Sequence, residues 1–163
     1  MAPSPTPSSS SKPSPRPTDG VVVNLALEGV ATQSTTCHDG EASFAIDGNS
    51  YGHVFNGGSV AHTCGNDIPW WMVDLGANKQ HAITRVSIYN RSDCCLDRIV
   101  DADVEVLDSV GNIVASRTIG DVQQVYNFDD FGGVYGRFVR IQKKSIGTIN
   151  IAEVEVMGFS FTL

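Results

Sequence analysis

The chain has 163 residues, of which 41% are hydrophobic and 18% charged, and its formal net charge at pH 7 is −7. This length favours one domain with a sizeable core, and the acidic excess argues against nucleic acid or anionic lipid as the main partner. No apolar run approaches the roughly 20 residues of a membrane-spanning helix. The N-terminus has no apolar signal core, and no glycine-rich phosphate loop precedes a helix. We therefore expect neither a nucleic-acid partner nor membrane insertion.

The first 17 residues hold six of the seven prolines together with six serines. Such a segment cannot bury apolar surface, and alternating prolines favour an extended, semi-rigid spacer. We expect residues 1–19 to be a Pro/Ser-rich flexible linker and residues 20–163 to be the domain. A chain that begins in this way is typical of a fragment of a longer protein, so we expect another domain N-terminal of the linker. A disordered tail would have the same composition.

After the linker, short apolar runs recur with a period of two or as brief continuous stretches, separated by glycine-rich and Asp-Gly turns. None of them keeps a helical spacing over three turns. The pattern predicts an all-β fold, a sandwich or jelly roll of about eight strands with the binding loops at one end. The expected strands are Val21–Ala26, Trp71–Leu75, Ile83–Tyr89, Val104–Leu107, Ile113–Ser116, Val122–Phe128, Phe138–Ile141 and Val154–Val156.

Two long loops, residues 32–69 and 90–98, contain all four cysteines and three of the four histidines. Loops at the end of a sandwich carry variable chemistry, so this concentration indicates a functional site. Trp70 and Trp71 follow the first loop and look like an aromatic platform for a ligand. Trp71 begins an expected strand, however, and we expect it in the core.

The segment after the strand that ends at Tyr89 holds Arg91 and Arg98 on either side of two adjacent cysteines. Arginine offers a fixed fork of hydrogen-bond donors that suits oxygen-rich ligands, and the intervening Asp93 can orient such a fork. The alternative is a loop with ordinary surface ion pairs. A bridge between Cys94 and Cys95 would close a strained small ring of the kind found at functional sites.

The four cysteines permit three connectivities, so each of the adjacent cysteines could instead pair elsewhere. Cys37 and Cys64 form the obvious second pair and would tie together the loops beside the site. Such bridges imply a secreted, extracellular setting. An alternative is a zinc metallohydrolase in which Cys37, His38, His62 and Cys64 hold the metal.

A catalytic pair of carboxylates is hard to find. Asp101, Asp103 and Glu105 share one expected strand face, as do Glu153 and Glu155, and such rows are typical of a solvated face rather than of an acid/base pair across a pocket. No Ser-His-Asp signature stands out. We therefore expect that the protein is not an enzyme.

The segments HTCGNDIPWWMVDL and NRSDCCLDR resemble the F-type lectins, or fucolectins, a branch of the discoidin-like jelly-roll folds. The resemblance runs from about Asn24 to Met157 and includes NLALEGVATQS, AIDGN and IAEVEVMG. The fucose motif of the family is a histidine, a long gap, and then Arg-x-Asp-x4-Arg or Lys. The gap is slightly longer here, and we expect the excess in the hairpin loop 76–80. The motif maps onto His62, Arg91, Asp93 and Arg98.

The resemblance implies that His62, Arg91 and Arg98 contact the axial hydroxyl of L-fucose, its neighbour and the ring oxygen. Asp93 would support the arginines, and a Cys94–Cys95 disulfide would pack on the apolar face of the sugar.

Two further contacts are expected from the family and from position. Phe55 would lie near the fucose methyl group, or else be an aromatic at the edge of the core. His38 would touch the next sugar, or else be an ordinary surface histidine.

The resemblance also implies a structural calcium ion between AIDGN and AEVEV. Two carboxylates with neutral oxygens suit a hard cation; the alternative is an Asp-Gly turn beside an exposed strand glutamate. The family's frequent disulfide between these loops is missing, because Val60 and Ala152 occupy its positions, and Cys37–Cys64 would replace it. The expected ligands are Phe44, Asp47, Asn49, Ser59, Ala152 and Glu153, with Phe44 and Ala152 giving carbonyl oxygens.

We thus expect a secreted, non-catalytic module that binds terminal fucose on glycans and targets an attached domain to them. A discoidin-like adhesion or lipid-binding module is a further alternative. Such modules insert apolar side chains from their loop tips, whereas these loops carry mostly Gly, Ser, Asn, Asp and Thr.

Overall fold

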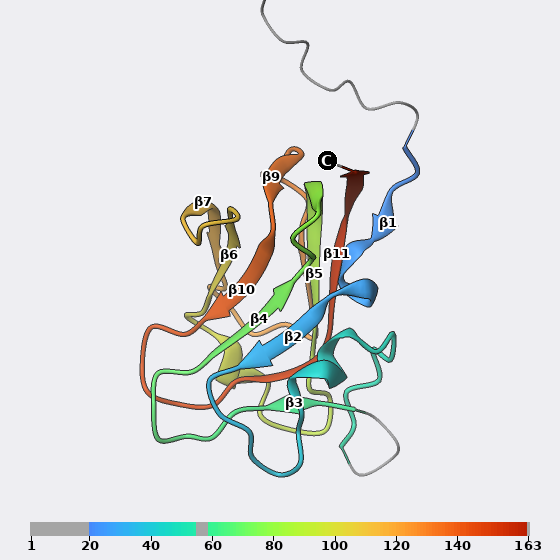
Figure 1. The fold of residues 1–163 in the computed structure, drawn as a ribbon. Coiled ribbons are helices and arrows are strands. Elements are labelled where there is room, and N and C mark those ends of the chain that lie inside the picture. The colour runs from blue at the N-terminus through green and yellow to red at the C-terminus, as the bar shows by residue number, and fades with distance from the viewer. Residues whose placement is uncertain (1–19, 55–58, 163) are drawn as a thin grey trace, which may run out of the picture.

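The computed structural model describes residues 20–54 and 59–162. They form two antiparallel sheets that pack as a sandwich (Figure 1), as the sequence predicts. In the first sheet the order is β1 (Val23–Asn24), β11 (Asn150–Thr162), β5 (Lys79–Asn90) and β8 (Val125–Phe128), with β3 (Ala61–His62) on β11 and β9 (Val134–Gly136) on β5. In the second it is β2 (Val30–Gln33), β4 (Trp70–Asp74), β10 (Phe138–Gln142), β6 (Asp103–Leu107) and β7 (Ile113–Thr118).

The core lies between the sheets and is built from alternate apolar side chains. Trp71 is fully buried, as expected, and its indole Nε1 donates a hydrogen bond to the Ala42 carbonyl at 3.0 Å. Trp70 is half-buried. The other central side chains include Val73, Ile83, Val86, Ile88, Val104, Val106, Val139, Ile141, Val154 and Val156.

The strand count and the first element differ from expectation. The described residues form eleven strands rather than about eight, because the short β2, β3 and β9 were not predicted. The run 21–26 pairs only over β1 and then turns into the 3-10 helix η1 (Leu25–Glu28). Asn24 causes the change: its side-chain oxygen accepts hydrogen bonds from the backbone N–H of Ala26 and of Val156.

The long strand β5 connects the two ends of the sandwich. Its last residue, Asn90, leads directly into Arg91, at the end where β3, η2 (Ala42–Ile46) and η3 (Leu96–Ile99) gather (Figure 1). The first described residues and the end of β11 lie at the opposite end. The loops that hold the expected site therefore lie together at one end, as the sequence predicts. Within the described ranges, no helix has the length and apolarity needed to cross a membrane.

Candidate functional site

A cavity of about 510 Å³ opens among the loops at the β3 end of the sandwich. It brings together six of the eight residues expected at the sugar site. Asp93 lies behind the lining, and Phe55 falls outside the described residues. The lining consists of His38, Asp39, Val54, Val60, His62, Arg91, Cys94, Cys95 and Arg98.

Arg91 is held in one orientation by Asp93. Its Nε and Nη2 atoms donate hydrogen bonds to the two carboxylate oxygens of Asp93 at 2.6 and 3.0 Å. These hydrogen bonds from Arg91 lower the pKa of the Asp93 carboxyl to about 2, so it is charged at any physiological pH. A two-point pair of this kind fixes the guanidinium plane. The remaining nitrogen, Nη1, has no hydrogen-bond partner among the described residues and can donate to a ligand in the cavity.

The backbone around Arg91 is anchored by two neighbours. The buried Asn90 accepts a hydrogen bond from the Arg91 N–H at 2.9 Å and donates to the Leu96 carbonyl, which closes the loop across its ends. On the other side, the Ser92 N–H donates to the Gly52 carbonyl at 2.9 Å. A Cβ at Gly52 would lie 2.5 Å from the Asn90 oxygen, so only glycine permits this approach.

Arg98 enters the cavity from η3, which begins after Cys95 adopts a left-handed backbone with φ of +64°. The Arg98 Nη1 donates to the Asn150 side-chain oxygen at 2.8 Å. Asn150 is fully buried at the start of β11. Sequence reasoning missed it, because the two residues are 52 positions apart and only the sheet brings them together.

The adjacent cysteines Cys94 and Cys95 are joined by a disulfide, and both line the cavity. Both are half-buried, so the bridge presents sulfur and methylene surface beside the arginines. The cavity therefore combines charged donors with a small apolar wall.

His62 lies on β3, where it pairs in register with Asn150, and only 8% of the residue is exposed. Its Nδ1 lies 2.9 Å from the Thr63 carbonyl. Burial lowers the pKa of His62 most; the Thr63 hydrogen bond opposes this, while charge on His38, Arg98 and Arg91 adds to the lowering. The ring is thus neutral at pH 7. Because a carbonyl only accepts, the proton lies on Nδ1 and Nε2 is a hydrogen-bond acceptor.

The loop that carries His38 is fixed against His62. A disulfide joins Cys37 to Cys64, as expected, and the Cys37 N–H donates to the His62 carbonyl at 3.0 Å. In turn the His62 N–H donates to the Gly40 carbonyl at 2.9 Å. The ring of His38 meets the ring of His62 edge-on, with 4.8 Å between the ring centroids. His38 therefore lies at the rim of the same cavity.

The zinc hypothesis is wrong for this arrangement. The Cys37–Cys64 disulfide uses both sulfurs that would have to be thiolates. Across residues 20–54 and 59–162 no three His, Cys, Asp or Glu side chains gather as metal ligands.

Three of the carboxylates considered for catalysis are paired on the sheet or lie in a turn. Glu105 accepts from Arg140 at 2.7 Å, and Asp103 lies 2.9 Å from the Lys144 ammonium. Asp101 is not on the strand but in the preceding turn, with φ of +66°. None of the three lines the cavity.

A second group of oxygen atoms forms where the loop after η2 meets β11. The Ser59 hydroxyl donates to Asp47 at 2.6 Å, and the Gly48 N–H donates to one Glu153 oxygen at 3.2 Å. Glu153 is not an exposed strand glutamate: it is 1% exposed, and its second oxygen has no partner among the described residues. Burial raises the pKa of Glu153 to about 7, and the charges of Asp47 and Glu155 add to the rise. A nearby cation would offset the cost of burying the negative charge of Glu153.

The other expected calcium ligands lie in the same region. Ala152 falls at a β-bulge of β11 directly before Glu153, so it has no partner in the register with β5. Phe44 belongs to η2. Asn49 faces its own loop, where its side-chain oxygen accepts from the Tyr51 N–H at 3.1 Å. Two carboxylates with hydroxyl, amide and carbonyl oxygens fit a hard cation.

Comparisons with known proteins agree with this architecture. Residues 44–141 match the family model described as a NedA-like, galactose-binding domain. A fucolectin from Anguilla anguilla is 34% identical over 147 residues, which cover 82% of this chain and 89% of that protein.

Two solved structures are similar in both sequence and fold. A fucose binding module from Streptococcus pneumoniae superimposes with a TM-score of 0.76 and 34% identity, over 82% of this chain and 94% of that one. The lectin domain of lectinolysin, complexed with Lewis B antigen, gives a TM-score of 0.75 and 31% identity, over 82% and 95%.

Proposed function

Because this chain belongs to the fucolectin, or F-type lectin, family, we propose that it is a lectin module that binds terminal L-fucose on glycans. The observation that carries the proposal is the convergence of His62, Arg91 and Arg98 on one cavity. The lectinolysin domain that was solved with Lewis B antigen has the same fold.

The hydrogen-bonding capacity of the three side chains complements a sugar edge. The Nε2 atom of His62 accepts from one hydroxyl, while Arg91 and Arg98 donate to hydroxyl and ring oxygens on either side. Asp93 and Asn150 hold the two guanidinium groups in place, so little side-chain entropy is lost on binding. A hydroxyl group can both donate and accept a hydrogen bond. A site in which the His62 acceptor lies between the Arg91 and Arg98 donors therefore favours a ligand with hydroxyl groups.

The apolar parts of the sugar require a different surface. In the proposal the Cys94–Cys95 bridge packs against the C–H face, Phe55 lies near the methyl group, and His38 touches the next sugar of the glycan. A neutral ligand of this kind needs no opposite charge on the protein, which is consistent with the net charge of −7.

The proposal includes a structural calcium ion and no catalytic step. Asp47, Asn49, Ser59 and Glu153 would hold the ion with the carbonyl oxygens of Phe44 and Ala152. The two disulfides suit an oxidising, extracellular setting. Residues 1–19 would tether the module to a further domain, which it would bring to fucosylated glycans.

The assignment is tested by replacing Arg98 and a matched arginine outside the site. Arg98→Ala removes charge-assisted hydrogen bonds worth about 2 kcal/mol, so we expect the Kd for methyl α-L-fucopyranoside to rise at least about thirtyfold in calorimetry. Arg85→Ala is the control, because that side chain is 44% exposed on β5 and pairs loosely with Asp129 at 3.7 Å.

The control variant should bind as the unchanged chain does. A folded Arg98→Ala variant with full affinity would overturn the site assignment.

A further inference from the structure

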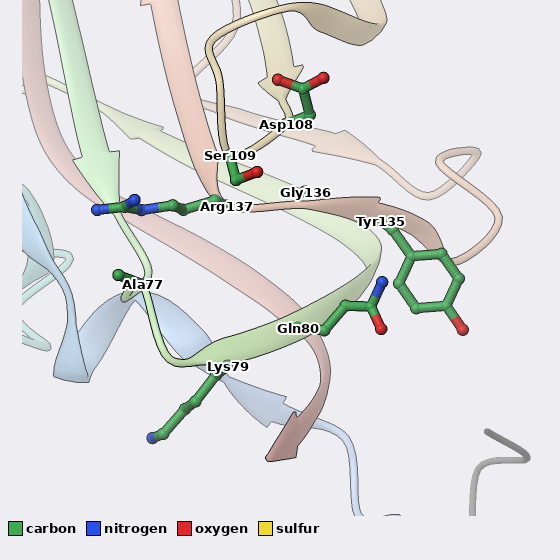
Figure 2. A pocket seen from close by; sticks show the side chains of 8 residues that line it. All are labelled: Ala77, Lys79, Gln80, Asp108, Ser109, Tyr135, Gly136 and Arg137. Carbon is green, nitrogen blue, oxygen red and sulfur yellow. The ribbon is translucent and has the colours of Figure 1, made fainter. Parts of the chain in front are cut away.

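A second cavity, of about 270 Å³, lies at the other end of β5 (Figure 2). Its lining includes Gln80 near the start of β5, whereas Arg91 follows the end of that strand. At about 3.3 Å per residue, the strand separates the two positions by roughly 35 Å. The two cavities share no lining residue, so the second cavity belongs to a different site.

One wall of this cavity is formed by the exposed ring of Tyr135 and the side-chain amide of Gln80. Tyr135 is 44% exposed on β9, where it pairs in register with the small Ala82 of β5. Gln80 is two residues before Ala82, so it shares that face of the strand, and its side chain points toward the Tyr135 ring (Figure 2). On the other side of Gln80, Phe161 pairs with it in register.

The two rings form a continuous apolar strip. The centroids of Tyr135 and Phe161 lie 6.5 Å apart, with the ring planes tilted by 56°. Tyrosine commonly presents an apolar face together with a polar tip. A ligand with a C–H face and hydroxyl groups at its edge matches this combination.

The lining also contains two neutral polar side chains, those of Gln80 and Ser109. The side chains of Gln80 and Ser109 have no hydrogen bond or ion pair with any other residue that the structure describes, and Ser109 lies in the turn between β6 and β7. Together with the Tyr135 hydroxyl they supply both donors and acceptors. A hydroxyl-rich ligand would satisfy all three.

The charged groups of the lining are occupied by protein partners. Arg137 donates to both oxygens of Asp74 at 2.8 and 2.6 Å, and the Lys79 ammonium lies 3.0 Å from Glu28. Asp108 accepts hydrogen bonds from its own turn, including one from the Val110 N–H at 2.9 Å.

The two basic groups are also turned away from the Tyr135 ring. The head groups of Lys79 and Arg137 point away from Gln80 and Tyr135 (Figure 2). The cavity therefore offers no unpaired charge to attract a charged ligand.

We propose that this cavity is a second carbohydrate subsite, which takes a neutral hexopyranose of monosaccharide size. Its volume lies near the lower end of the range for small-ligand pockets, about 300–1,000 Å³. The sugar stacks its C–H face on Tyr135, and its hydroxyls bond to Gln80 and Ser109. One copy of the chain then carries two sugar sites at opposite ends, and it can bridge two glycans without forming a dimer.

The test is a titration of the ¹⁵N-labelled chain with three neutral probes: methyl β-D-galactopyranoside, methyl α-D-glucopyranoside and methyl α-D-mannopyranoside. We expect at least one of them to shift the amide resonances of Gln80, Ser109 and Gly136, with a Kd on the order of 1–10 mM. Tyr135→Ala should weaken this binding about tenfold. Tyr135→Phe keeps the ring and should retain most of the affinity.

The fucose site serves as an internal control. Tyr135→Ala should bind methyl α-L-fucopyranoside as the unchanged chain does, and Arg98→Ala should bind the hexoside normally, so the two sites succeed or fail separately. If none of the three hexosides moves these resonances at about 50 mM, well above the expected Kd, the subsite does not exist. Equal hexoside affinity in the Tyr135→Ala variant would likewise overturn the proposal.

Discussion

The neutral state of His62 is set by its surroundings. Burial disfavours the charged ring, and Arg91 and Arg98 add like charge, so the pKa lies below the ordinary value near 6.5. The Thr63 carbonyl takes the Nδ1 proton. The free Nε2 is then an acceptor, and protonation there would replace an acceptor with a third donor.

This predicts a pH dependence of sugar binding. As the pH falls below about 6.5, through the lowered pKa of His62, we expect the fucose Kd to rise by up to about tenfold per pH unit, because binding requires the unprotonated ring. Asp93, with a pKa of about 2, stays charged throughout this range. The measurement is calorimetry between about pH 8 and pH 4.5.

A non-titrating variant gives the control. His62→Gln should bind more weakly but with a constant Kd over the same range, because the amide does not titrate. If the unchanged chain shows no pH dependence, or the Gln variant keeps it, His62 is not the acceptor.

The Cys94–Cys95 bridge predicts a different effect on binding than on stability. The bridge joins adjacent residues, so the loop that it closes is very short and it restricts the unfolded state little. Its sulfurs line the cavity, however. For the double variant Cys94→Ser, Cys95→Ser we expect at least about fivefold weaker fucose binding, roughly 1 kcal/mol, with the midpoint of thermal unfolding almost unchanged.

Titration calorimetry and a thermal scan of the same sample separate the two effects. Unchanged affinity in the double variant would show that the bridge does not contact the sugar.

Local motifs were readable from the sequence, and distant partners were not. Arg91, Asp93 and Arg98 lie within eight positions, so their common loop could be predicted. Asn150 could not be found, because its contact with Arg98 depends on β11 passing beside η3. The burial of Glu153 was missed for the same reason, since the loop that covers it is 105 positions away.

At the scale of elements, strand prediction depended on length. The runs 71–75 and 138–141 were found within one residue of β4 and β10, each of which has five residues. The strands that were not predicted, β2, β3 and β9, have two to four residues and carry too few side chains for a period to show. The N-terminal valines were read as a strand through residue 26, but Asn24 bonds its own backbone and begins η1.

The Cys37–Cys64 disulfide should be the main covalent source of stability. It spans 27 positions, and closing a loop of that length in the unfolded chain corresponds to about 3–4 kcal/mol. For Cys37→Ser, Cys64→Ser we expect the free energy of unfolding to fall by about this amount, measured by urea denaturation.

The Cys94→Ser, Cys95→Ser variant is the matched control. It also loses one disulfide, but that disulfide joins adjacent residues and closes no long loop in the unfolded chain. Equal destabilisation of the two double variants would contradict the loop-closure explanation.

For the whole molecule, the proposed calcium ion connects stability to the sugar site. The loop between η2 and β3 contains Asp47 and Ser59, and also Gly52, whose carbonyl holds the backbone beside Arg91. A cation that holds this loop against Glu153 on β11 would therefore stabilise both the fold and the backbone beside Arg91. At a calcium concentration of about 100 times the Kd, the gain is about 2.7 kcal/mol, which raises the unfolding temperature by about 5–10 °C.

Differential scanning calorimetry with calcium and with EDTA measures this shift. Glu153→Gln should lose most of the calcium response. Glu155→Gln should keep it, because that side chain bonds to the Tyr89 hydroxyl at 3.3 Å and is not among the proposed ligands. An identical unfolding temperature with calcium and with EDTA would exclude the ion.

The position of the first and last described residues has a practical consequence. The first described residues, which lead into β1, and the end of β11 lie at the end of the sandwich opposite the loops around β3 (Figure 1). Additions made directly before residue 20 or directly after β11 would therefore start on the side away from the cavity that His62 and Arg91 line. Copies joined in tandem would keep that cavity open in every copy, and their combined avidity could exceed that of one copy without any change at the site.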